Sequence, residues 1–230
     1  MENKTGKYFK YAIGETLLVI IGILIALQVS NWNQKRIDTN SYNIILNSLV
    51  SDLENDIKEL TNLSKVSNNQ NNIIVNVLNN KDIHKDSLSS IVNALCLSPE
   101  SFTPNKSSFD ILANYGSFDL LKLEEVSTDV QSLFNSATKI NQESYADRNK
   151  LIAEKIRPFI MKSGAVSIDI GNNITINNEA LIELMYSSQE LKGYLIELHM
   201  VNHILITKRL DPLNNKFKDV ANNLKTKSKN

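Results

Sequence analysis

The stretch Gly14–Asn33, GETLLVIIGILIALQVSNWN, is the most apolar part of this 230-residue chain. Eleven Leu, Ile or Val residues lie between Ile13 and Val29. A helix over residues 11–32 would be about 33 Å long, which matches the roughly 30 Å hydrocarbon core of a bilayer. Its apolar side chains favour insertion by about 3 to 7 kcal/mol, and a carboxylate costs about 2.5 to 3.5 kcal/mol at mid-membrane. We therefore expect a transmembrane helix over residues 11–32, in preference to a buried helix of a soluble domain.

Aromatic residues bracket this segment. Tyr8, Tyr11 and Trp32 stand where a membrane helix carries its interfacial anchors. No small-x-small cleavage pattern follows the apolar run, which disfavours removal as a signal peptide. The segment is therefore expected to remain in the protein as a signal anchor in contact with membrane lipid.

Basic residues are slightly more frequent before the segment than after it. Lysines at positions 4, 7 and 10 precede it, whereas Lys35 and Arg36 follow it and are partly offset by Asp38. Because positively charged flanks tend to stay in the cytoplasm, residues 1–10 are predicted to form a basic cytoplasmic leader. The main domain would then lie on the outer side of the membrane.

A stripe of small residues follows one face of the predicted span. At 100° per residue, Gly22 and Ala26 lie within about 20° of Glu15, and Ser30 is one turn further along. Small residues allow two helices to approach closely in lipid, so this stripe predicts a helix–helix interface. Glu15 is either paired inside that interface or hydrated at the level of the headgroups, and the sequence leaves both interpretations open.

The segment KYFKYAIGETLLVIIGILIALQVSNWN, residues 7–33, resembles the N-terminus of a family of small bacterial membrane proteins. That family is typical of Bacteroidota and is described as domain of unknown function 6090. Ser30 stands where the family pattern has Asn, and SSFDILANYGSFDLL, residues 107–121, is similar to the family's central segment. The resemblance implies a single-pass protein of the bacterial inner membrane with a periplasmic main domain. It implies no activity.

Residues 33–224 are predicted to form a helical extramembrane domain. After Asp38, apolar residues recur every three or four positions, as in the helix of a bundle or a stalk continuous with the membrane helix. The motif Ser107-x-x-Asp110 is similar to a capping box, and Pro158 is expected to kink or end a long helix. Asp211-Pro212 predicts the start of a new helix, and residues 225–230 form a basic tail that is expected to be frayed.

The stretch AVSIDIGNNITIN, residues 165–177, interrupts the helical pattern. Isoleucines alternate with polar residues on either side of Gly171-Asn172-Asn173, which is typical of a short β-hairpin. Asn177 or Asn178 is expected to cap the helix that follows. The fold class expected from the sequence is therefore mainly α, with an N-terminal transmembrane helix, a helical bundle and one short β-hairpin.

The sequence contains few candidates for chemistry. His199 and His203 lie one helical turn apart, as two ligands of a metal site would, but no third ligand is evident. Cys96 lies between two leucines and is expected to be a buried apolar residue. We find no phosphate-binding loop, nucleotide-binding glycine motif or nucleophile elbow, so the chain is expected to have no cofactor and no catalytic residues.

The balance of charges argues against nucleic acid as a partner. With 25 basic and 25 acidic residues the chain has no net charge that would favour nucleic acid. The expected function is a non-enzymatic interaction or ligand-sensing module that self-associates through its anchor. The alternatives are an accessory subunit that binds another membrane protein and, less favoured, a metal-dependent enzyme of the cell envelope.

Overall fold

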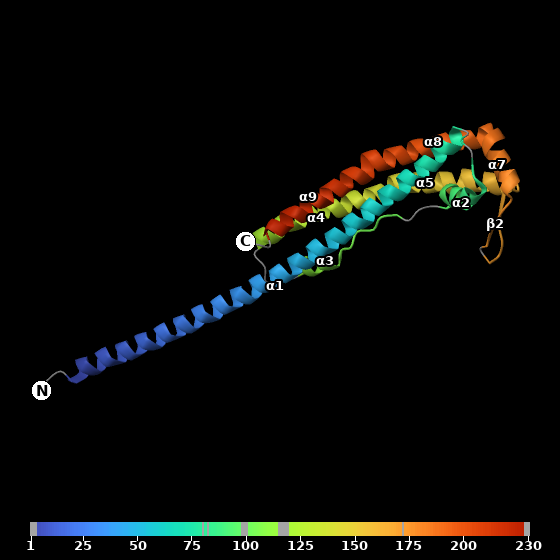
Figure 1. Cartoon of the computed structure of the whole chain (residues 1–230). Helices are drawn as coiled ribbons and strands as arrows, with labels where there is room; N and C mark the ends of the chain where they lie inside the picture. Colours follow the sequence, from blue (N-terminus) through green and yellow to red (C-terminus); the bar gives the residue numbers. More distant parts are fainter. Residues whose placement is uncertain are drawn as a thin grey trace.

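The computed structural model of the chain describes residues 4–79, 81, 83–97, 101–114, 120–171 and 173–227. Its longest element is α1 (Lys4–Leu78), an unbroken helix of 75 residues. The first part of α1 projects alone, and its second part lies within a helical bundle (Figure 1). Both interpretations of the pattern after Asp38 therefore hold, because the same helix is a stalk and then a bundle helix. No break separates the predicted span from the predicted domain.

Two further long helical segments complete the bundle. The first, residues 120–162, comprises α4 (Leu120–Ile140), α5 (Ala146–Leu151) and α6 (Arg157–Lys162), joined by the π-helical turns η2 (Asn141–Tyr145) and η3 (Ile152–Ile156). The second, residues 189–227, comprises α8 (Gln189–Leu205) and α9 (Asp211–Lys227), joined by the π-helical turn η4 (Ile206–Leu210). The first runs in the same direction as α1, and the second runs back beside them (Figure 1).

The return of α9 brings the predicted tail onto the bundle. Helix α9 extends to Lys227, and Lys225 Nζ lies 2.5 Å from Glu54 Oε1 on α1. The expectation that the tail frays at residue 225 is therefore wrong for its first three residues, because they continue a helix that packs on α1. Residues 228–230 lie outside the described part of the chain.

Both prolines within the long segments follow a π-helical turn. Pro158 comes two residues after η3 and Pro212 two residues after η4. In a regular α-helix a proline ring clashes with the carbonyl group of the residue four positions earlier. The extra residue of a π turn moves that carbonyl group and so relieves the clash. Of the two outcomes expected at Pro158, a kink or an end of the helix, the end is excluded, because the helix continues past Pro158 to Lys162. Asp211 begins α9 as expected but has helical backbone angles (φ −64°, ψ −46°), so it is not an N-cap.

Buried apolar side chains form two clusters along the bundle. The first lies nearer the stalk and joins α1 from Leu46 to Leu63 with α4 and α9. The second lies at the far end and joins Ile74 and Val77 of α1 with α2 (Leu88–Cys96), α8 and the segment from Leu151. Edge-on aromatic pairs occur in both clusters, namely Phe102–Phe217, Phe109–Phe134 and Phe159–Tyr194.

A 3₁₀ turn, η1 (Lys85–Ser87), precedes α2, and an irregular segment, residues 101–106, leads to α3 (Ser107–Asn114). The predicted capping box at the start of α3 is wrong in detail. The amide of Ser107 donates to Asn105 Oδ1 at 3.0 Å, and the amide of Ser108 donates to Asp52 Oδ2 at 3.2 Å. The cap therefore comes partly from α1, which ties α3 to the long helix. The sequence also predicts that Gly116 ends this helix, and that residue lies outside the described part of the chain.

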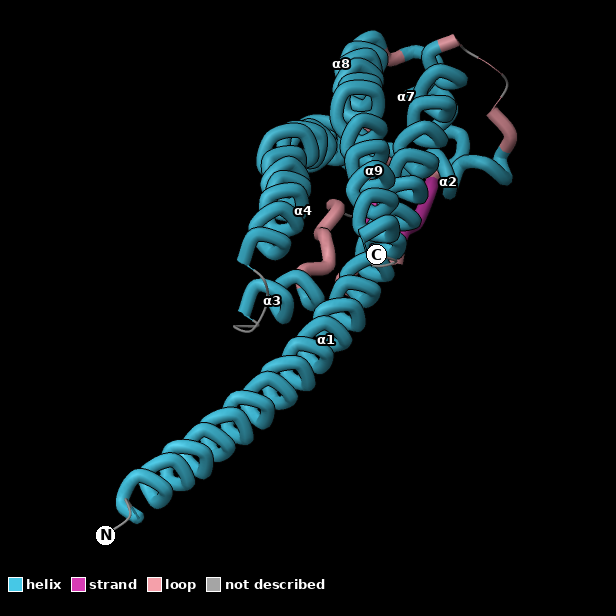
Figure 2. Tube along the Cα trace, turned by 90° about the vertical axis from the view of Figure 1, so that its left-hand side faces the viewer, coloured by secondary structure: helices cyan, strands magenta, loops and turns pink. Residues whose placement is uncertain are grey.

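The predicted hairpin and the cap after it are confirmed. Strands β1 (Val166–Ile168) and β2 (Ile174–Ile176) pair antiparallel, with Val166 opposite Ile176, and α7 (Asn178–Ser187) follows. Asn177 Oδ1 accepts a hydrogen bond from the amide of Ala180 at 3.2 Å. Figure 2 shows a trace that is helical nearly throughout its described part, with the hairpin in magenta. The mainly α fold class is therefore confirmed.

Candidate membrane anchor and interaction surface

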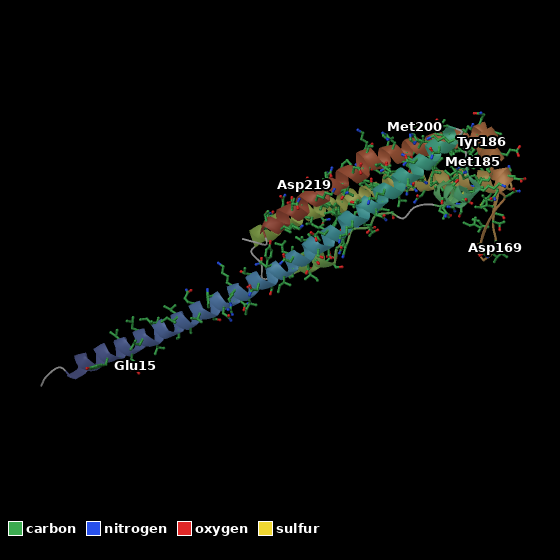
Figure 3. All side chains as sticks on the ribbon, viewed as in Figure 1. Glu15, Asp169, Met185, Tyr186, Met200 and Asp219 are labelled. Carbon is green, nitrogen blue, oxygen red and sulfur yellow. The ribbon has the colours of Figure 1, made fainter. Side chains whose placement is uncertain are left out.

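The part of α1 that begins at Tyr11 is long and apolar enough to span a membrane. Its most apolar 18-residue window has a mean hydropathy of 2.3, and none of that window is buried in the chain. Figure 3 shows its side chains, Glu15 among them, projecting from a helix that has no neighbour. Leu18 is 71% exposed, although burial in a folded domain would be expected for a leucine in water. Such exposure is what a helix in contact with lipid would have.

The predicted stripe lies on this free part of α1. Glu15, Gly22, Ala26 and Ser30 are on the same helix and exposed or open to their surroundings. A Cβ atom built on Gly22 would meet no heavy atom within 4 Å. The structure thus brings the four residues to one helix face, and within the described residues no other segment of the chain covers it.

Two of the three predicted interfacial anchors are exposed at the ends of the span. Tyr11 is 75% exposed and Trp32 is 68% exposed. The guanidinium carbon of Arg36 lies 5.9 Å from the centre of a Trp32 ring, one turn further from the apolar window. This stacking fits the boundary between lipid and water. The side chain of Tyr8 lies outside the described part of the chain.

The stripe continues beyond the span as an exposed apolar seam that the sequence reasoning missed. Ile37 and Ile44 are two helical turns apart, and their side chains are 45% and 66% exposed. At 100° per residue they lie on the same face of α1 as Ala26 and Ser30, roughly opposite the face that carries the buried Leu53. Their angular position around the helix differs from that of the buried apolar residues, and this difference is the sequence signal that could have identified them. We call Ile37 and Ile44 the stalk seam.

A layer of buried polar side chains separates the two apolar clusters. We call this layer, formed on α1, α5 and α8, the central polar layer: Ser67, Gln70, Asn71, Arg148 and Asn202. Asn202 Nδ2 donates to Gln70 Oε1 at 2.7 Å, and Gln70 Nε2 donates to the carbonyl of Ala94. The polar run SNNQNN, residues 67–72, would be expected to weaken the helix. The amide of Gln70, within this run, is instead used in contacts across the bundle.

The largest member of this layer is Arg148, which is fully buried. Its guanidinium carbon lies 4.8 Å from the centre of the Tyr145 ring. Burial lowers the pKa of Arg148 to about 10 and raises the pKa of the Tyr145 hydroxyl to about 12. At neutral pH the arginine is therefore a cation and the tyrosine is neutral, which suits a stacked structural pair.

The histidine pair is not brought together with further ligands. His199 is partly buried on α8, and His203 is exposed one turn later. Within the described residues no group of three His, Cys, Asp or Glu side chains is placed to hold a metal ion. Cys96 is buried, and burial raises the pKa of its thiol to about 11, so it is a weak nucleophile at neutral pH.

Comparisons of the chain with protein-family models, with curated proteins and with solved structures give no match. The resemblance of residues 7–33 to a family of bacterial membrane proteins therefore stays a prediction.

Proposed function

We propose that this chain is a single-pass, non-enzymatic membrane protein whose bundle presents an interaction or ligand-sensing surface. The observation that carries the proposal is the continuity of α1, which extends from the apolar segment to the far end of the bundle. An event at either end of such a helix is transmitted without a flexible linker. This arrangement suits a protein that couples the membrane to a surface held away from it.

The proposed orientation has the N-terminus in the cytoplasm and the bundle in the periplasm of a bacterial inner membrane. The lysines before the span and the family resemblance support it. A reporter enzyme that is active only in the periplasm, fused after Asn230, is expected to be active. A second reporter that is active only in the cytoplasm, fused at the same residue, should be silent. The opposite pair of results would reverse the orientation.

Self-association is proposed along the face of α1 that carries Gly22, Ala26 and Ser30 and continues as the stalk seam. Two copies inserted with the same orientation hold this face at the same depth, so their α1 helices meet in parallel and in register. The bundles lie on roughly the opposite side of α1, as the burial of Leu53 indicates, and therefore do not obstruct the contact.

The Gly22→Leu variant tests this interface. The new side chain meets nothing within its own chain, so the fold should be unaffected, but it separates two closely packed helices. We expect the dissociation constant to rise about tenfold, equivalent to roughly 1.4 kcal/mol. The measurement is energy transfer between labelled chains in vesicles of increasing lipid content.

The matched control for this variant is Leu24→Phe, which enlarges a side chain about 160° away on the same span. It should leave the energy transfer as in the unmodified chain. Equal loss in both variants, or loss in neither, would exclude the stripe as the interface.

A further inference from the structure

A small basic pocket lies between α4 and the η4–α9 corner of the bundle. Its volume is about 150 Å³, and four of its lining residues are cations: Lys139, Lys208, Arg209 and Lys216. Ile140 and Leu213 supply apolar lining. The cations come from two segments about 70 residues apart in the sequence, and therefore only the folded bundle gathers them.

The positive charge of the pocket is poorly compensated. Glu143 is the acidic residue that contacts it, with Oε2 3.6 Å from Arg209 Nη2 and Oε1 3.9 Å from Lys139 Nζ. Both distances are near the upper limit of an ion pair. Within the described residues Lys208 and Lys216 form no ion pair, so the pocket holds four cations against one carboxylate.

Arg209, one of the four cations, also carries a buried donor that lacks an acceptor. Arg209 Nε is inaccessible to solvent and has no hydrogen-bond partner in the part of the chain that the structure describes. A buried donor without an acceptor is costly, so native structures normally satisfy it. An anion bound among the four cations would supply the missing negative charge.

The backbone around the pocket is also irregular. Turn η2 begins directly after Ile140, and Lys208 and Arg209 lie within η4. Single π-helical turns are frequent at functional sites because they change the direction of side chains on an otherwise regular helix. Here η4 places two consecutive cations beside the α4 surface.

The position of the pocket decides where its ligand comes from. Asp211, beside the pocket residue Pro212, accepts a hydrogen bond from Ser64 Oγ at 2.9 Å. Ser64 is 32 positions after Trp32, which corresponds to about 48 Å along a straight helix. Headgroups of the membrane that holds the anchor are therefore out of reach, and the ligand is a solute.

We propose that this pocket binds a small dianionic oxyanion, namely inorganic phosphate or a compact phosphate ester, from solution. The volume admits a group of this size, and the charge favours a dianion over chloride. This inference names a ligand class for the sensing part of the proposed function and rests on it. It does not require self-association.

Calorimetric titration of the full chain in detergent with inorganic phosphate, at constant ionic strength, tests the proposal. We expect saturable binding that is absent with chloride. The variant Lys208→Gln/Lys216→Gln should weaken binding about tenfold, since it removes two exposed cations without disturbing the core. The matched control, Lys150→Gln/Lys218→Gln, removes two exposed lysines outside the pocket and should bind as the unmodified chain does.

Three further titrations separate the ligand sources and classes. Glycerol phosphate should compete with inorganic phosphate, whereas vesicles of anionic phosphatidylglycerol should not. No binding above chloride, equal binding by the two lysine variants, competition by the vesicles, or tighter binding of malonate than of phosphate would each overturn the proposal. Energy transfer between labelled chains, measured on the same variants, should remain unchanged, so a failed pocket is distinguishable from a failed self-association.

Discussion

Replacement of Ile21 and Leu24 by lysine in one variant will release the chain from membranes. Each lysine near mid-span costs about 2.5 to 3.5 kcal/mol, and each lost apolar side chain removes a further 0.3 to 0.6 kcal/mol or so. The sum, about 6 to 8 kcal/mol, is comparable to or larger than the roughly 3 to 7 kcal/mol by which the apolar side chains favour insertion. The expected result is recovery of the variant in the soluble fraction after alkaline carbonate extraction, where the unmodified chain stays in the pellet.

A variant with two lysines on the exposed face of α4, Gln131→Lys/Asn135→Lys, is the control. It adds the same charge to the bundle and should remain in the pellet. Ile21 and Leu24 are 44% and 55% exposed and contact no part of the bundle core, so their replacement should not unfold the domain. Retention of the Ile21→Lys/Leu24→Lys variant in the pellet would contradict the anchor.

Raising the pH from 5.5 to 8 will destabilise the bundle through Asp56. This carboxyl is 3% exposed and accepts from the Asn105 amide at 3.2 Å with both oxygens. Burial, the largest influence, raises its pKa from 3.8 to about 7, although the hydrogen bond opposes the rise. The folded state therefore binds this proton more tightly than the unfolded state does. Its contribution to stability is present at acidic pH and is lost as the pH rises through 7.

The Asp56→Asn variant keeps an oxygen acceptor for the Asn105 amide and cannot ionise. We expect the unmodified chain to lose about 2 kcal/mol between pH 5.5 and 8, whereas Asp56→Asn should be nearly independent of pH. Thermal unfolding followed by circular dichroism in detergent measures the difference, which corresponds to roughly 4 to 8 °C. Asp110→Asn, on the exposed side of α3, should retain the pH dependence of the unmodified chain. A flat profile in the unmodified chain would exclude Asp56 as its source.

Elements with local causes could be predicted from the sequence. The apolar segment, the hairpin around Gly171 and the cap at Asn177 each depend on residues within a few positions of one another. The uninterrupted course of α1 past SNNQNN could not be predicted, because Gln70 is held by Asn202 and Ala94 from other helices. The passage of a helix through Pro158 depends likewise on a π turn that has no simple sequence signature.

For the candidate site too, only the features that depend on local spacing could be predicted from the sequence. The helical period placed Glu15, Gly22 and Ser30 on one face, but a single chain cannot supply the surface that would cover them. The basic pocket was not predicted, because Lys139 and Arg209 meet only when residues 120–162 and 189–227 pack together.

The continuity of helix α1 has a mechanical consequence. Leu78, where the helix ends, is 46 positions after Trp32, which corresponds to about 69 Å of helix. A spanning helix accommodates a thinner bilayer by tilting. Since no hinge interrupts α1, a tilt of about 10° would sweep the hairpin end of the bundle sideways by about 12 Å over this lever arm. In the proposed membrane topology, a small change in bilayer thickness would thereby be amplified into a displacement larger than the diameter of a helix backbone.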